Sequence, residues 1–118
     1  MNKHGLVERM CAYNKAISEP NRMKMIKILG SNPPETLKVG DIAAILGISQ
    51  PAVTKHLHVM EEVGLFSRKR IGTSVFYSLN EEALEEYRTE LDNAFAHGHT
   101  PCAHGFKCDE CPVAETCM

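Results

Sequence analysis

No long hydrophobic run is present in this chain of 118 residues, whose longest unbroken apolar stretch is Ile42–Leu46. A membrane-spanning helix needs about 20 apolar residues, and a secretory leader has an apolar core of about 7–15. We therefore expect no membrane segment, no export and a cytoplasmic location. Because thiols stay reduced in that compartment, the cysteines favour metal binding or redox chemistry over a disulfide framework.

The chain also lacks the residue patterns of common enzymes. It shows no hydrolase-type triad, no glycine-rich phosphate loop and no paired catalytic carboxylates, which nucleophilic, phosphoryl-transfer and acid–base chemistry require. We therefore expect that the protein is not an enzyme, with a small thiol oxidoreductase using Cys108 and Cys111 as a remote alternative. The composition, 43% hydrophobic and 24% charged, predicts one compact domain with a real core.

The net charge of −2 hides a strong asymmetry along the chain. Residues 1–80 hold 11 Lys and Arg against 6 Asp and Glu, a net charge of +5. Residues 81–118 hold 2 against 9, a net charge of −7. A basic body with an acidic end suggests nucleic acid as the partner of the first part.

Apolar periodicity predicts five helices and one hairpin. The first helix carries a stripe of Leu6, Met10, Tyr13 and Ile17. The second helix is capped by Asn21 and stopped by Gly30, the third covers 39–46, and the fourth runs from the cap Ser49 to about Gly64. A hairpin over 65–79, which turns at 72–74, follows. The last helix runs from the cap Asn80 to about 97–98 and carries an apolar stripe of Leu84, Tyr87, Leu91 and Phe95.

A helix-turn-helix followed by a hairpin is the layout of a winged helix-turn-helix, a mainly α fold with a small β-hairpin wing. Four stretches of this chain resemble the ArsR/SmtB family of bacterial repressors. They correspond to the entry of the second helix (18–26), the turn and recognition helix (46–57), the exit of that helix (62–66) and the wing (68–72). The resemblance covers residues 5–97. It implies a homodimeric repressor of double-stranded operator DNA whose first and fifth helices form the dimer interface.

The residues themselves support DNA binding independently. A recognition helix presents short polar side chains and cations to the major groove, where Gln suits adenine and Ser or Thr suits phosphates or base edges. Consecutive cations on a wing suit the phosphate backbone. The predicted DNA-binding residues are Ser49, Gln50, Thr54, Lys55 and His58 on the helix, and Arg68, Lys69, Arg70 and Thr73 on the wing. His56 is expected to face the core or a neighbouring helix.

The last part of the chain is a cysteine-rich tail, residues 99–118, which follows the domain formed by residues 1–98. Its cysteines are Cys102, Cys108, Cys111 and Cys117, in the pattern Cys-x5-Cys-x2-Cys-x5-Cys. Four thiolates so close together can enclose one soft metal centre, and the x2 spacing suits two adjacent coordination positions. We therefore predict that all four are ligands of one centre.

The spacing also bears on which centre is bound. All-cysteine zinc sites usually use two short-spaced pairs, whereas this tail has one. The run Cys-x2-Cys-x5-Cys resembles the cluster-binding run of iron–sulfur regulators, so an iron–sulfur cluster is the cofactor we predict. Zn²⁺, As(III) or another thiophilic heavy metal, and a dithiol–disulfide switch stay open as alternatives.

The chain departs from the family at the family's usual metal sites. Arsenic sensors often carry Cys-Val-Cys at the start of the third helix, where this chain has Lys38–Asp41 without cysteine.

Three histidines border the tail, and we expect solvent exposure rather than ligation for His97, His99 and His104. We expect Cys11, beside the apolar stripe of the first helix, to be a core residue.

Overall fold

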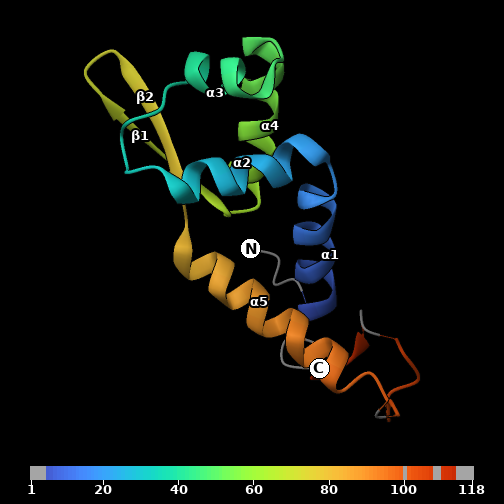
Figure 1. Ribbon diagram of the computed structural model, residues 1–118. Helices are drawn as coiled ribbons and strands as arrows, with labels where there is room; N and C mark the ends of the chain where they lie inside the picture. The colour runs from blue at the N-terminus through green and yellow to red at the C-terminus, as the bar shows by residue number, and fades with distance from the viewer. Residues whose placement is uncertain (1–4, 100, 108–109, 114–118) are drawn as a thin grey trace.

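A computed structural model describes residues 5–99, 101–107 and 110–113 (Figure 1). Within these residues it contains five helices and one antiparallel pair of strands, the winged helix-turn-helix that the sequence predicts. The elements are α1 (Leu6–Ile17), α2 (Pro20–Ser31), α3 (Val39–Leu46), α4 (Gln50–Glu62), β1 (Phe66–Ile71), β2 (Ser74–Leu79) and α5 (Glu81–Ala96). No helix of the described part combines the length and the apolarity needed to cross a membrane.

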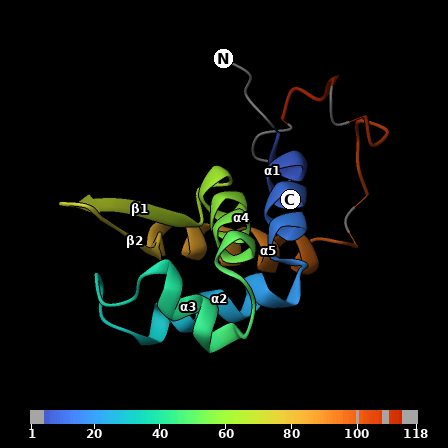
Figure 2. The ribbon, with the colours of Figure 1, turned by 90° about the horizontal axis from the view of Figure 1, so that it is seen from above.

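The molecule is elongated, with extents of 52 × 29 × 23 Å. α3, α4 and the wing (β1 and β2) lie at one end, α1 and α5 lie at the other, and α2 runs between them (Figure 1). Seen from above, the wing projects away from the helices (Figure 2). The helix-turn-helix and the wing therefore share one end, and the tail leaves α5 at the opposite end.

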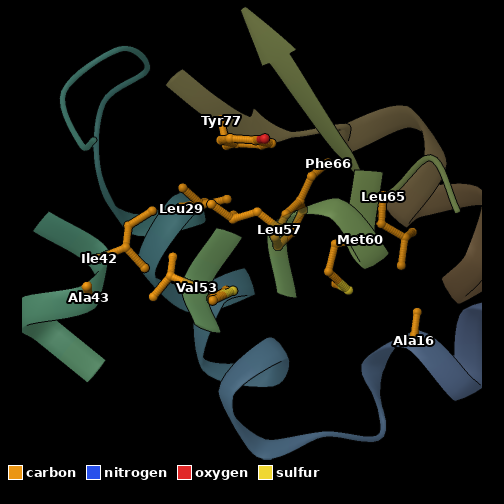
Figure 3. Close-up of a cluster of buried hydrophobic side chains, with 11 residues drawn as sticks. Ala16, Leu29, Ile42, Ala43, Val53, Leu57, Met60, Leu65, Phe66 and Tyr77 are labelled. Carbon is orange, nitrogen blue, oxygen red and sulfur yellow. The ribbon is translucent and has the colours of Figure 1, made fainter. Parts of the chain in front are cut away.

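The main core is built around α4. Its residues Val53, Leu57 and Met60, spaced as one face of a helix, are all 0% exposed (Figure 3). Other elements, and Leu65 just before β1, contribute the rest of this buried cluster: Ala16, Met25, Leu29, Ile42, Ala43, Leu65, Phe66 and Tyr77. Each large side chain buried here contributes about 1.5–3 kcal/mol, so the core fixes α4 relative to α2, α3 and the wing.

The turn of the helix-turn-helix forms as the sequence predicts. Gly47 ends α3 in the left-handed conformation with φ of 69°, and its backbone N–H donates to the carbonyl of Ala43 at 2.8 Å. Ser49 caps α4, because its hydroxyl accepts a hydrogen bond of 3.2 Å from the backbone N–H of Ala52. These two helix caps determine where α3 ends and where α4 begins.

The second helix differs from the prediction at both ends. Glu19, rather than Asn21, is the N-cap: its carboxylate accepts from the backbone N–H of Arg22 at 3.1 Å. Pro20 is then the first helical residue, where its missing N–H costs nothing. Gly30 does not stop the helix, which runs to Ser31.

Gly30 has a packing reason to be there. A Cβ at this position would lie 3.0 Å from Cδ1 of Leu79 on β2. The glycine therefore lets α2 approach the wing closely.

The wing has a two-residue turn. β1 and β2 pair in antiparallel register from Phe66 opposite Leu79 to Ile71 opposite Ser74. The loop is therefore Gly72 and Thr73, and Ser74 belongs to β2 rather than to the predicted three-residue turn. Gly72 has φ of 61°, a positive value that the first loop residue of a type II′ hairpin requires.

The fifth helix packs on α1 through a small second cluster formed by Leu6, Met10 and Tyr87. Asn80 caps this helix as predicted, accepting a 3.2 Å hydrogen bond from the backbone N–H of Ala83. Only Tyr87 of the predicted stripe on α5 is fully buried, and Phe95 is 77% exposed. The stripe therefore continues beyond the area that this single chain covers.

Candidate nucleic-acid interface and cysteine tail

The face of α4 opposite the core is polar. Lys55 and His58 are exposed and Thr54 is half-buried. Thr54 and His58 lie four residues apart, so they occupy neighbouring positions on one side of the helix. Because the buried residues hold the other side in the core, these three side chains point toward solvent at the end of the molecule where the wing also lies.

Gln50, the first residue of α4, is exposed and lies over the start of α3. Its Nε2 atom is 3.3 Å from the position that a Cβ on Gly40 would occupy. Gly40 thereby leaves room for the Gln50 side chain, a relationship that sequence reasoning missed. Ser49 is also exposed, although its hydroxyl is used as the helix cap.

His56 faces α2 rather than solvent. Its Nε2 atom lies 3.7 Å from Oε2 of Glu19, and its side chain is 19% exposed. The sequence left open the core or a neighbouring helix, and the structure selects the neighbouring helix. His56 therefore links the recognition helix to the start of α2.

The wing divides its three consecutive cations between two faces. In the register of the hairpin, Arg68 pairs with Tyr77 and Arg70 pairs with Val75, on the face that turns toward the core. Lys69 pairs with Phe76 on the opposite face, since alternate residues of a strand point to opposite sides. All three cations and Thr73 at the turn are exposed.

Each wing cation has a partner within the chain. Nζ of Lys69 lies 2.7 Å from Oε1 of Glu35, in the segment between α2 and α3. Nε of Arg68 lies 3.7 Å from Oε2 of Glu61 on α4. The Arg70 side chain donates to a backbone carbonyl in its own turn at 3.2 Å. The acidic partners were absent from the sequence prediction because both lie outside the hairpin, Glu61 on α4 and Glu35 in the segment before α3.

The cysteine tail is described in part. Cys102 and Cys111 are half-buried and neither is in a disulfide. Cys108 and Cys117 lie outside the described residues. Across 5–99, 101–107 and 110–113, no group of three or more His, Cys, Asp or Glu side chains is placed to hold a metal ion. Ligation by all four cysteines therefore stays a prediction.

The sulfur of Cys102 sits against backbone amides of the turn that follows it. The N–H of His104 donates to its Sγ at 3.4 Å. Hydrogen bonds from the backbone of Phe106 and of His104 lower the pKa of the Cys102 thiol, because they favour the charged form. This turn therefore favours the thiolate, the form that binds metals.

Cys11 is exposed, so the prediction of a core residue is wrong: Leu6 and Met10 bury their side of α1, and Cys11 lies on another. His99 and His104 are exposed as expected. His97 is exposed as well, and its Nδ1 lies 3.0 Å from the carbonyl oxygen of Asn93.

Comparison with known proteins supports this reading of the fold. A family model described as a helix-turn-helix domain matches residues 17–65. The chain is 35% identical to the transcriptional repressor SdpR of Bacillus subtilis over 72 residues, which cover 61% of this chain and 77% of SdpR. It is 30% identical over 88 residues to the HTH-type transcriptional regulator YgaV of Escherichia coli, covering 75% of this chain and 87% of YgaV.

A solved structure shows the same fold. It is the homodimeric winged helix-turn-helix DNA-binding domain of a possible ArsR-family transcriptional regulator from Mycobacterium bovis, with a TM-score of 0.61 and 18% identity. The match covers 82% of this chain and 90% of that domain.

A recognition helix with a polar outer face, beside a basic wing, defines a winged helix-turn-helix DNA-binding protein. The relatives are transcriptional regulators and not enzymes, which confirms that expectation for this chain. The chain belongs to the ArsR/SmtB family of DNA-binding transcriptional repressors.

Proposed function

We propose that this repressor acts as a homodimer whose operator binding responds to an iron–sulfur cluster held by the four tail cysteines. The observation that carries the proposal is that a four-cysteine tail follows directly on α5, the helix expected at the dimer interface. The family's usual cysteine pair is missing from the start of α3, so the tail is the replacement sensing site.

Operator contacts are assigned to the exposed polar residues at one end of the molecule. The proposed base and phosphate contacts on the helix are Ser49, Gln50, Thr54, Lys55 and His58. The proposed phosphate contacts on the wing are Arg68, Lys69, Arg70 and Thr73. Eight of these side chains are exposed and Thr54 is half-buried. This accessibility, and their common end of the molecule, support the assignment.

The dimer interface is assigned to α1 and α5 at the opposite end. Phe95 is 77% exposed in the single chain, and together with Leu91 it lines a shallow hollow on α5. A second copy would remove these two apolar side chains from water, which favours association. The homodimeric state of the similar Mycobacterium bovis domain supports the same assignment.

The described tail residues fit a thiolate-bound centre. Cys102 and Cys111 carry free thiols that are partly accessible, and a backbone N–H already donates to the sulfur of Cys102. Hydrogen bonds to cysteine sulfurs are among the features that tune iron–sulfur clusters. A bound cluster would supply a centre whose state changes with oxygen or redox conditions.

The connection between tail and DNA runs through α5 and α1. Nη2 of Arg9 on α1 lies 3.4 Å from Oε1 of Glu90 on α5. The hydroxyl of Tyr87 donates a hydrogen bond to Oδ1 of Asn14 across the same pair of helices. The tail begins where α5 ends. A change in the tail therefore acts on the dimer helices, and the geometry of the dimer sets the spacing of the two recognition helices.

The first test is anaerobic purification of the full chain, with an absorption spectrum and analysis of iron, sulfide and zinc. A brown protein that contains iron and sulfide supports the cluster. A colourless protein with stoichiometric zinc refutes it in favour of a zinc site. Tight binding of As(III) by a colourless, metal-free protein, or reversible disulfide formation in the tail, selects one of the remaining alternatives.

The second test measures sensing. Duplexes selected by the wild-type chain from a random library serve as the DNA probe. The double variant Cys108→Ser, Cys111→Ser should bind them with an affinity that no longer depends on metal or redox state. Cys11→Ser, an exposed thiol on α1, is the matched control and should keep the wild-type response. If the double variant responds as the wild type does, the tail is not the sensor.

A further inference from the structure

The segment between α2 and α3 presents an acidic side chain to the wing. Glu35 has φ of 63°, a left-handed backbone conformation that residues with a side chain rarely adopt. The hydroxyl of Thr36 donates to the carbonyl of Pro33 at 2.6 Å and closes this turn. An unfavourable conformation persists where its surroundings hold it, and such residues are often functional.

The Glu35 side chain reaches Lys69 on the wing. Oε1 of Glu35 and Nζ of Lys69 are 2.7 Å apart, although 34 residues separate them in the sequence. The segment that carries Glu35 passes beside the wing in both ribbon views (Figures 1 and 2). Lys69 is thus bound to a carboxylate in the DNA-free chain, at the atom that would bind a phosphate.

The contact between this segment and the wing is not tightly packed. A pocket of about 500 Å³ is lined by Pro33, Pro34 and Glu35 on one side and by Ser67 and Ser78 of the strands on the other. Glu35, one partner of the ion pair, lines this open space. Its release would therefore disturb little buried surface.

Both partners are accessible to solvent, with side chains 66% exposed for Lys69 and 42% exposed for Glu35. Exposed ion pairs are weak and are screened by salt. A DNA phosphate, which belongs to a dense array of negative charge, can therefore replace the carboxylate. The carboxylate nevertheless reduces the affinity for every DNA by a small factor.

We propose that Glu35 is an intramolecular competitor of DNA phosphate for Lys69, released when the wing docks on the duplex. The proposal rests on the proposed DNA-binding role of the wing. Its function is to weaken binding at random sequence, where phosphate contacts supply most of the affinity. At the operator, base contacts on α4 supply additional affinity.

The test is a double-mutant cycle with Glu35→Gln, Lys69→Gln and the combined variant. Affinities are measured in low salt for a library-selected duplex and for a random duplex. We expect Glu35→Gln to raise affinity two- to fivefold on both duplexes, and the gain to shrink as salt is added. In the Lys69→Gln background, Glu35→Gln should change affinity by less than a factor of 1.5.

Two further variants complete the design. Glu35→Asn removes the charge with a residue that tolerates the left-handed conformation, and should give the same gain with an unchanged melting temperature. Glu62→Gln removes one negative charge from the exposed last residue of α4, which is neither a proposed DNA contact nor part of α1 or α5, and should leave affinity nearly unchanged.

The other outcomes overturn the proposal in distinguishable ways. A loss of affinity in Glu35→Gln would mean that Glu35 orients Lys69 toward DNA. An equal gain in the Lys69→Gln background would mean simple repulsion between Glu35 and DNA. Unchanged affinity in Glu35→Gln, with wild-type binding intact, refutes the competition alone. Failure of the wild type to bind any duplex refutes the proposed function and this inference with it.

Discussion

The hydroxyl of Tyr87 on α5 donates a hydrogen bond of 2.5 Å to the amide oxygen of Asn14 on α1, across 73 residues of sequence. The Tyr87 ring also packs edge-on against Tyr13, with ring centroids 5.5 Å apart and an angle of 81° between the rings. This pair of helices buries only a small apolar cluster. Polar and aromatic contacts therefore contribute much of what holds α5 to α1.

We predict that Tyr87→Phe lowers the free energy of unfolding by about 0.5–1.5 kcal/mol, the usual net contribution of one hydrogen bond. The ring and its packing are kept, so the loss reports the hydroxyl. Denaturant titration at fixed protein concentration measures the loss, because the stability of the proposed dimer depends on concentration. Asn14→Ala should cost a similar amount, and adding it to Tyr87→Phe should cost little more. Full additivity would show that the two groups are not coupled.

Tyrosine ionisation should make the fold less stable at alkaline pH. Burial raises the pKa of Tyr13, Tyr77 and Tyr87 above the ordinary 10.0, and nearby carboxylates add to the shift of Tyr13 and Tyr77. A raised folded-state pKa means that the unfolded chain loses these protons first as pH rises. The stability from the neutral phenols is therefore complete below about pH 10 and falls through the folded-state pKa values. Tyrosinate absorbance should give a higher midpoint in native protein than in denaturant, and equal midpoints would contradict this.

Phe95 tests the proposed dimer face. Because its side chain is 77% exposed in the single chain, Phe95→Ser should leave the monomer fold intact. It should weaken dimerisation by about 1–2 kcal/mol, roughly a tenfold rise in Kd. Sedimentation across a concentration series measures this change. Phe106→Ser, equally exposed at 79% but beyond α5, is the control and should associate as the wild type does. Unchanged association of the Phe95 variant would place the interface elsewhere.

The proposed base contact of Gln50 can be tested through Gly40. A Cβ in Gly40→Ala would lie 3.3 Å from Nε2 of Gln50 and would displace that side chain by a few tenths of an ångström. We expect loss of discrimination at one base pair of the selected duplex, on the order of 1 kcal/mol. Stability should not fall, because alanine favours helix over glycine. Binding to a panel of single-base variants of the duplex measures the effect. The same substitution in a Gln50→Ala background should do nothing further, and a further loss there would mean that Gly40 acts by another route.

Most of the fold could be predicted from local signals in the sequence. The stripe of Val53, Leu57 and Met60 located α4 and its buried face, and Gly47 with Ser49 located the turn before it. The prediction was wrong where tertiary contacts, and not local sequence, determine the structure. Gly30 looked like a helix stop because glycine commonly ends helices, whereas its position is explained by the approach of Leu79.

The sequence could name candidate DNA contacts, which stay a prediction, but it could not show how these residues are arranged. Alternation along a strand separates Lys69 from Arg68 and Arg70, but the pairing with β2 decides that the arginines, opposite Tyr77 and Val75, lie on the face that turns toward the core. Glu35 reaches the wing only because the chain folds back over 34 residues. Burial of Cys11 was predicted wrongly because it follows Met10 directly, and adjacent helical residues point about 100° apart.

Along α4, the residues that pack in the core lie on one side of the helix, and the residues that face solvent lie on the other. Leu57 and Met60 are fully buried, whereas Lys55 and His58 are exposed. Substitutions on the outer face therefore have little effect on stability. A chain built in this way can acquire a new operator through changes at a few outward positions while its scaffold is inherited intact, so duplicated copies can diverge in the genes they control before they diverge in fold.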